Sequence, residues 1–152
     1  MSEIDFRAAT ENDIPVLMSL VRALAGEDGS TTFHPDRAEA AMRQLLADSS
    51  LGEAWIIERQ GSVAGYVVIT WGFSLEFHGR DAFVDELYLL PGLRGQGIGR
   101  LAIEHAAERC RARGIGAVHL EVDPDNERAV SLYRRNGFVQ RGYRIMSRRL
   151  TS

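Results

Sequence analysis

Residues 89–100 of this 152-residue chain read Leu-Leu-Pro-Gly-Leu-Arg-Gly-Gln-Gly-Ile-Gly-Arg. An apolar strand pattern ends at Pro91, and an amphipathic helix pattern begins after the glycines. Glycines allow consecutive backbone N–H groups to converge without obstruction by side chains. The N-terminus of a helix adds partial positive charge at the same point. The stretch therefore predicts a site for a phosphate or diphosphate, to which Arg94 and Arg100 would add charge-assisted hydrogen bonds.

Two other kinds of phosphate-binding loop do not fit this stretch. A P-loop requires Gly-x-x-x-x-Gly-Lys-Ser/Thr, and the chain contains no lysine. A dinucleotide-binding fingerprint requires Gly-x-Gly-x-x-Gly, usually after a first strand, whereas the spacing here is Gly95-x-Gly97-x-Gly99, deep in the chain. A simple tight turn is the remaining alternative, and the strand–loop–helix setting disfavours it.

Outward from this stretch, the hydrophobic pattern predicts a series of strands and helices in the order β-α-α-β-β-β-α-β-α-β-β. This order indicates an α/β (α+β) fold, with a mixed, mostly antiparallel sheet of six to seven strands and helices on both faces. A helix starts in the polar cluster at residues 10–13 and gives way to a loop over 26–32. The other helices are expected over 36–48, from the glycines to about 113, and over 124–135, and the strands over 4–8, 54–59, 63–71, 82–90, 117–122, 138–140 and 143–149.

Length and composition narrow the class of protein. A chain of 152 residues suits a single domain spanning 1–152. Hydrophobic residues make up 45% and charged residues 26%, which is a globular balance, and the net charge of −3 disfavours nucleic acid as a partner. We find no signal-peptide core and no apolar run long enough to cross a membrane, and the single Cys110 excludes an intrachain disulfide. These features predict a cytoplasmic protein without a membrane partner.

The sequence resembles the GNAT superfamily of acetyl-CoA-dependent N-acetyltransferases. That family carries Arg/Gln-x-x-Gly-x-Gly/Ala at the end of its fourth strand, and residues 94–99 match this motif in full. Residues 4–13 resemble its opening strand and helix start, and residues 126–138, NERAVSLYRRNGF, resemble its later coenzyme-binding helix. The resemblance covers nearly the whole chain. It implies the fold of that family, acetyl-CoA as the acyl donor, and a homodimer.

The resemblance also implies where the coenzyme binds. Its diphosphate would lie on the backbone amides of residues 95–100, and its pantetheine arm would follow the preceding strand. Tyr133, two helical turns after Asn126 and on the same face, would lie beside the thioester sulfur and donate a proton to the departing thiolate. Core packing is the alternative for Tyr133. The coenzyme-binding residues implied in this way are Leu87, Tyr88, Leu89, Arg94, Gly95, Gln96, Gly97, Ile98, Gly99, Arg100 and Asn126.

Carboxylates are the candidates for the amine side of the reaction, because an alkyl amine is mostly protonated at neutral pH and must lose a proton before it attacks. Asp85 and Glu86 lie on the strand that leads to the glycines. Adjacent residues of a strand point to opposite faces, so at most one of the two is expected to face the reaction centre directly. The segments LVRALAGED, VDELYLLPGLRGQGIG and NERAVSLYRRNGF most resemble spermidine/spermine-type diamine acetyltransferases.

This closer resemblance implies Asp85 as the general base and Glu27 and Asp28 as an amine-binding pair. A solvated loop after a helix is the alternative for the latter two residues. The expected reaction is direct acetyl transfer to a small-molecule primary amine in a ternary complex. A protein lysine or N-terminal amine as the acceptor, and a non-catalytic CoA-binding module, remain open as alternatives. The four histidines show no metal-ligand spacing, so no metal is predicted.

Overall fold

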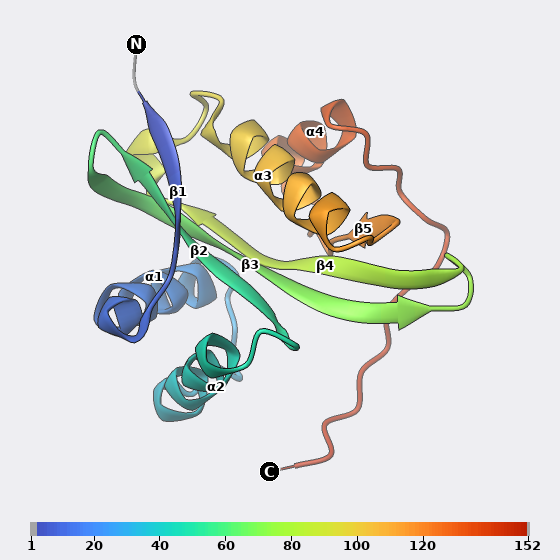
Figure 1. The fold of residues 1–152 in the computed structure, drawn as a ribbon, viewed down its shortest axis with the longest axis horizontal. Coiled ribbons are helices and arrows are strands. Elements are labelled where there is room, and N and C mark those ends of the chain that lie inside the picture. Colours follow the sequence, from blue (N-terminus) through green and yellow to red (C-terminus); the bar gives the residue numbers. More distant parts are fainter. Residues whose placement is uncertain (1–2, 152) are drawn as a thin grey trace. The chain divides into compact units, whose positions relative to one another are not determined.

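The structure of this chain is a computed structural model that describes residues 3–151. Its contacts divide into two units, one up to Glu121 and one from Val122 onward, so the single domain expected from the chain length stays a prediction. The second unit contains one helix, α4 (Glu127–Arg135). The first unit contains β1 (Ile4–Ala8), α1 (Ile14–Glu27), α2 (Pro35–Ala47), β2 (Gly52–Arg59), β3 (Ser62–Ser74), β4 (Gly79–Leu89), α3 (Ile98–Ala112) and β5 (Ala117–His119), with 3-10 turns at Glu11–Asp13 and Pro91–Leu93 (Figure 1).

One sheet organises the first unit, and its strands follow the chain in the order β1-β2-β3-β4-β5. The first four strands are antiparallel to their neighbours, and β5 is parallel to β4, which confirms the mixed, mostly antiparallel sheet. β5 ends at His119 and pairs only with Asp81, Ala82 and Phe83 of β4. Beyond Phe83, the outer edge of β4 therefore pairs with no further strand among residues 3–151.

The sheet has five strands and not six or seven, because the last two predicted strands, residues 138–140 and 143–149, do not form. The backbone over 138–151 has no strand partner within the described chain. Val139, Tyr143 and Ile145 in this segment are 83%, 78% and 63% exposed. The alternation of apolar and polar residues that predicted these strands is present in the sequence. However, the apolar side chains are so exposed that they bury too little surface to fix a strand register.

Helices cover both faces of the sheet, as predicted. On one face, α1 and α2 pack over the side chains of Ile56, Tyr66 and Val68, and on the opposite face α3 packs over Ile57 and Ala64 (Figure 1). Ile56 and Ile57 are neighbours in β2 and are both fully buried, because successive residues of a strand point to opposite faces. Burial of these apolar side chains supplies the main driving force that holds the layers together.

The two ends of α1 determine where Glu27 and Asp28 lie. Asp13 ends the short turn before α1, where it accepts hydrogen bonds from the Thr10 amide at 2.8 Å and from both terminal nitrogens of Arg7 at 2.9 and 3.0 Å. The helix then runs to Glu27, two residues into the predicted loop of 26–32. Glu27 is therefore held on the last turn of a helix, and Asp28 is its C-cap residue.

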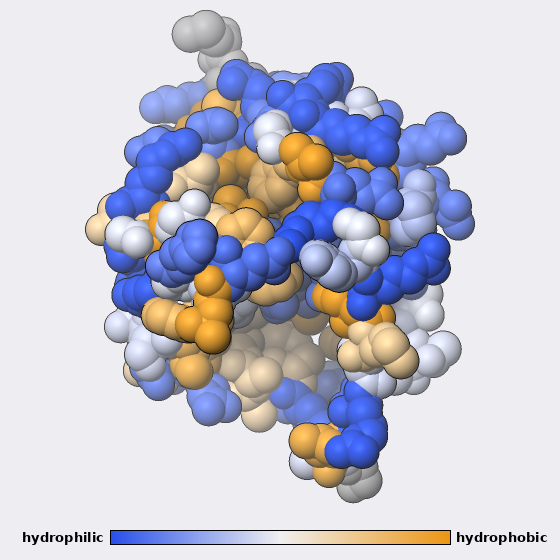
Figure 2. Space-filling view, turned by 90° about the vertical axis from the view of Figure 1, so that its right-hand side faces the viewer, coloured by the Kyte–Doolittle hydropathy of each residue, from blue (hydrophilic) through white to orange (hydrophobic). Residues whose placement is uncertain are grey.

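The surface of the described chain carries apolar side chains among the polar ones. Figure 2 shows them at several separate places on the face drawn. In the hairpin between β3 and β4, Phe73 and Leu75 are 71% and 84% exposed. None of the helices within residues 3–151 combines the length and the hydrophobicity that crossing a bilayer requires.

Candidate active site

The glycine loop between β4 and α3 has the backbone geometry that the sequence predicts. Gly95 and Gly97 have φ angles of 75° and 86°, a region that side-chain-bearing residues rarely adopt. Gly97 is the N-cap of α3, and within the described residues no side chain caps this end of the helix. Backbone amides at an uncapped helix N-terminus are the kind of group that can hold an anion such as a diphosphate.

The polar side chains of this loop are held by the protein itself. Gln96 donates to the carbonyl of Gly92 at 3.1 Å and accepts a hydrogen bond from Arg59 at 2.5 Å. Arg94 donates through Nε to the carbonyl of Leu89 at 2.9 Å and through Nη2 to Glu27 at 2.8 Å. Arg94 was expected to face phosphate, but its guanidinium is thus engaged with the strand and with α1, while Arg100 is exposed on the first turn of α3.

The strand that leads into the loop is irregular where the acidic residues lie. On β3, Val68 and Ile69 are adjacent, yet they pair with Glu86 and Val84, so Asp85 is an extra residue in β4. A β-bulge of this kind bends the strand and re-aims a side chain. The strict alternation assumed for Asp85 and Glu86 therefore does not apply across this step.

The bulge places acidic side chains around a buried tyrosine. The hydroxyl of Tyr66, whose side chain is fully buried, donates a hydrogen bond to Glu86 Oε1 at 2.8 Å. Burial raises the pKa of Glu86, and the charges of Asp85 and Asp28 raise it further. Burial also raises the pKa of Tyr66, helped by the negative charges of Glu86, Asp85 and Asp28. Of the predicted residues, Glu86 thus binds the hydroxyl of Tyr66, and Asp85 and Asp28 are near enough for their charges to act on both groups.

Asp85 differs from Glu86 in its surroundings. Its side chain reaches solvent, whereas that of Glu86 is half-buried. Protein atoms around it still raise the pKa of Asp85 through desolvation. Both carboxylates are consequently easier to protonate than an ordinary surface carboxylate, which is a property of groups that exchange protons with a substrate.

Glu27, which was predicted to bind the amine together with Asp28, has contacts of its own in the structure. Its carboxylate forms an ion pair with Arg94, and hydrogen bonds from Arg94 and Tyr88 lower its pKa. The guanidinium of Arg94 also lies over the ring of Tyr88, 5.2 Å from the centroid. Glu27 and Asp28 are adjacent in sequence, but they belong to two different polar clusters.

The predicted residues of the second unit lie on and next to α4. Asn126 is the N-cap of this helix, and its side-chain oxygen accepts a hydrogen bond from the Ala129 amide at 3.1 Å. Tyr133 lies two turns further along the helix, and its ring contacts Phe138 edge-on, with 5.9 Å between the centroids. A helix thus joins the two residues, and their predicted roles stay predictions. Asn126 thus caps the start of α4, in addition to the coenzyme contact that the resemblance implies.

Two polar features escaped the sequence analysis. Tyr66 lies within an apolar run, and nothing in the run itself identifies Glu86 as its partner. Asp81, only 7% exposed, lies 3.1 Å from Nε2 of His119, and the ring of Phe77 packs on that imidazole with 4.7 Å between centroids. A Cβ atom at Gly72 would approach Asp81 to 2.6 Å, so the missing side chain there makes room for this carboxylate.

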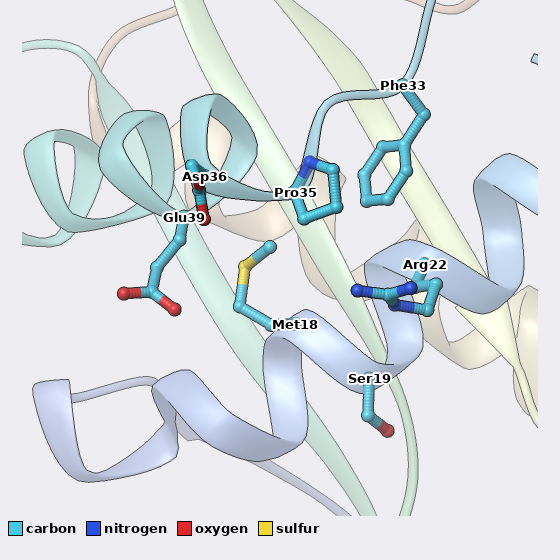
Figure 3. Close-up of a pocket in the computed structure, with 7 residues that line it drawn as sticks. All are labelled: Met18, Ser19, Arg22, Phe33, Pro35, Asp36 and Glu39. Atoms are coloured by element: carbon cyan, nitrogen blue, oxygen red, sulfur yellow. The ribbon is translucent and has the colours of Figure 1, made fainter. Parts of the chain in front are cut away.

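A pocket of about 380 Å³ lies elsewhere, between α1 and α2. Figure 3 shows Met18 and Arg22 of α1 opposite Phe33 and Pro35, with acidic side chains from α2 at the edge. None of the residues predicted for the site lines this pocket. Within the described residues, no group of three or more His, Cys, Asp or Glu side chains is arranged to hold a metal ion.

Comparisons with known proteins show sequence similarity to acetyltransferases. The chain is 36% identical over 114 residues to streptothricin acetyltransferase of Streptomyces lavendulae, which covers 75% of this chain and 51% of that protein, so the chain spans about half the length of this relative. It is 31% identical over 146 residues to thialysine N-epsilon-acetyltransferase of Mus musculus, with 88% of this chain and 83% of that protein covered.

Among solved structures, the fold matches aminoglycoside N-acetyltransferase AAC(6')-Iy in complex with CoA. The TM-score is 0.82 at 16% identity, with 99% of this chain and 97% of that chain covered. The sequence model of the acetyltransferase (GNAT) family matches residues 19–138. The chain therefore belongs to the acetyltransferase (GNAT) family, as an N-acetyltransferase with acetyl-CoA as its acyl donor.

Proposed function

We propose that this enzyme acetylates the primary amine of a small molecule by direct attack within a ternary complex. The observation that carries the proposal is the hydrogen bond from the buried hydroxyl of Tyr66 to Glu86 beside the bulge at Asp85, where the charges of Asp85 and Asp28 also act. Negative charge in one place attracts an ammonium group and raises its local concentration. The names of two relatives, which act on streptothricin and on thialysine, support a small amine as the acceptor.

The coenzyme would bind to backbone groups of the glycine loop and of the outer edge of β4. The amides of residues 95–100 would hold the diphosphate, because the positive φ angles of Gly95 and Gly97 turn them outward and the helix end favours negative charge. The outer edge of β4 after Phe83 would pair with the pantetheine arm. When bound, acetyl-CoA supplies an activated acetyl thioester.

The side chains of the protein would then move two protons. Asp85 or Glu86 would accept one proton from the ammonium group, directly or through water, so that the neutral nitrogen forms a bond to the acetyl carbon. As the carbon–sulfur bond breaks, Tyr133 would donate a proton to the sulfur, and the nitrogen bonded to the acetyl carbon would lose its second proton, through water, to the Tyr133 phenolate. This leaves free CoA, the acetylated amine and a neutral Tyr133. The carboxylate then returns its proton to water. Because the amine attacks the thioester directly, no acyl-enzyme forms.

Replacement of Tyr133 by Phe tests the acid. General acid catalysis contributes roughly 10²–10⁴-fold, so the Tyr133→Phe variant should lose at least about 10²-fold in kcat and change little in affinity for CoA. Turnover measured between pH 6 and 10, together with CoA binding by calorimetry, gives both values. A kcat that matches the wild type at every pH removes Tyr133 from this role. Tyr143→Phe, at a tyrosine that is 78% exposed, is the matched control.

The acceptor is best identified by an unbiased assay. Pools of diamines, amino acids, amino sugars and lysine-containing peptides are incubated with acetyl-CoA, free thiol is recorded, and acetylated products are identified by mass. We expect turnover of free small amines to exceed turnover of peptides. Preferential turnover of peptides would instead establish a protein lysine or N-terminal amine as the acceptor and contradict the proposal.

We also propose that the enzyme is a cytoplasmic homodimer without a nucleic-acid partner, as the sequence suggests. Light scattering on the purified chain at several concentrations measures its mass. A mass of one chain at all concentrations would contradict the dimer.

A further inference from the structure

One chain of contacts joins the end of α1 to the end of β4 through the glycine loop. Glu27 on the last turn of α1 binds Nη2 of Arg94 at 2.8 Å, and Nε of the same arginine binds the carbonyl of Leu89 at 2.9 Å. Arg94 is thus held at two nitrogens, from two different elements. The ring of Tyr88 lies 5.2 Å beneath the guanidinium and limits its movement on a third side.

The charges in this chain of contacts reinforce one another. Hydrogen bonds from Arg94 and Tyr88 lower the pKa of Glu27, and the hydrogen bond to Glu27 raises the pKa of Arg94. Both groups therefore stay charged over the range in which the enzyme would work. Charge-assisted hydrogen bonds of this kind are roughly twice as strong as neutral ones.

The same contacts separate Glu27 from the amine side. Its carboxylate is committed to Arg94, whereas the charge of Asp28 acts on Glu86 and Tyr66. An ammonium group that bound to Glu27 would have to displace a guanidinium that is held at two points. Asp28, Asp85 and Glu86 are the carboxylates that share one neighbourhood for this task.

We propose that Glu27 is a positioning residue for the coenzyme and not a ligand of the amine. By holding Arg94 against the end of β4, Glu27 fixes the segment in which Gly95 and Gly97 turn their amides outward. This inference rests on the proposed placement of the diphosphate on residues 95–100. Its consequence is that loss of Glu27 weakens acetyl-CoA binding and leaves recognition of the amine intact.

The test separates the two substrates of one enzyme. In the variants Glu27→Ala and Glu27→Gln, we expect the KM for acetyl-CoA and the Kd for CoA to rise about three- to tenfold, as the loss of a partly exposed, charge-assisted ion pair allows. The KM for the amine and kcat should stay within about twofold of the wild type. Glu27→Asp should recover part of the lost affinity, because it restores the charge.

Arg94→Ala supplies the second half of a double-mutant cycle. If Glu27 acts through Arg94, the double variant should bind CoA no more weakly than Arg94→Ala alone. Glu108→Ala is the matched control, since Glu108 also pairs with an arginine, Arg111, at the exposed far end of α3. The control should leave both KM values unchanged, and thermal melting confirms that each variant is folded.

Two results would overturn the inference. One is a CoA affinity that does not change, with or without a higher KM for the amine, and the other is a CoA affinity that increases. Gly97→Val distinguishes these from failure of the underlying placement. If Gly97→Val weakens CoA binding and Glu27→Ala does not, the loop binds the coenzyme and the role of Glu27 is wrong. If neither variant changes CoA affinity, the placement of the coenzyme itself is wrong.

Discussion

The glycine loop after β4 and the bulge at Asp85 within β4 offer different groups for the proposed chemistry. At the glycine loop the groups proposed to bind the coenzyme are backbone amides, and the polar side chains Arg94 and Gln96 are engaged with other parts of the protein. At the bulge the groups proposed to act are side chains, and burial is the main cause that raises the pKa of both Asp85 and Glu86. The loop should therefore be sensitive to changes of backbone conformation, and the bulge to changes of charge.

Removal of charge at the bulge should produce the largest effect. In Glu86→Gln the side chain keeps its shape and can still accept the hydrogen bond from Tyr66, but it cannot accept a proton. We expect kcat to fall roughly 10²–10³-fold, in the range of general acid–base catalysis, while CoA affinity stays unchanged. Steady-state kinetics and calorimetry measure the two quantities.

Asp85→Asn provides the comparison within the same bulge. Its side chain reaches solvent, so water can replace part of its contribution, and the loss in kcat should be smaller than for Glu86→Gln. The reverse order would assign the proton transfer to Asp85. Equal activity of both variants and the wild type would contradict the role of the acidic residues altogether.

A change of backbone conformation at the loop should have the next largest effect. A valine at position 97 would have to adopt a φ of 86°, which strains a β-branched residue, although no heavy atom lies within 4 Å of its added Cβ. The loop should relax to another conformation, and the Kd for CoA should rise by roughly 30–100-fold, corresponding to about 2–3 kcal/mol.

The control for this variant uses the same strain at a different place. Gly114 has a φ of 71° just after α3, with nothing within 4 Å of an added Cβ. Gly114→Val should destabilise the fold to a similar degree without a specific loss of CoA affinity. If both variants weaken CoA binding equally, the effect of Gly97→Val is one of stability. That result would contradict the proposal that the backbone conformation of the loop controls CoA binding.

The two regions also differ in how far the sequence predicts them. The loop could be predicted because its signal is local: glycine spacing, a preceding strand and a following helix are all contiguous over residues 89–100. The order of strands and the placement of helices on both faces followed from the same kind of local pattern. Local pattern failed over residues 138–149, where strand formation depends on a partner that no local pattern supplies.

The acidic residues show why the rest of the site could not be predicted. Asp85 and Glu86 were assigned to opposite faces, but the register of β4 against β3 introduces an extra residue at Asp85. Glu27 and Asp28 were treated as a pair, but α1 extends far enough for Glu27 to reach Arg94, 67 positions later in the chain. Both contacts join partners that are distant in sequence, as does the contact between Tyr66 and Glu86, and the roles predicted for these residues stay predictions.

The smallest expected effect comes from the hydroxyl of Tyr66 and refines the account of the bulge. This hydroxyl donates to the Glu86 carboxylate and favours its ionised form, so it opposes the rise in pKa that burial causes. In Tyr66→Phe the pKa of Glu86 should rise further. We expect the acid limb of the kcat/KM profile to move to higher pH and activity near neutral pH to fall by about three- to tenfold.

The folding stability of Tyr66→Phe should also depend on pH, in the direction set by the raised pKa of Glu86. The pKa of Glu86 is higher in the folded state than in the unfolded state. The contribution of Glu86 to the free energy of unfolding is therefore complete at acid pH and is lost as the pH rises through the folded-state pKa. Tyr66→Phe enlarges this loss, so the variant should be destabilised more at pH 7 than at pH 4. Urea unfolding at both pH values measures the difference. An equal cost at both values would mean that the hydroxyl serves packing alone and that Glu86 does not depend on it.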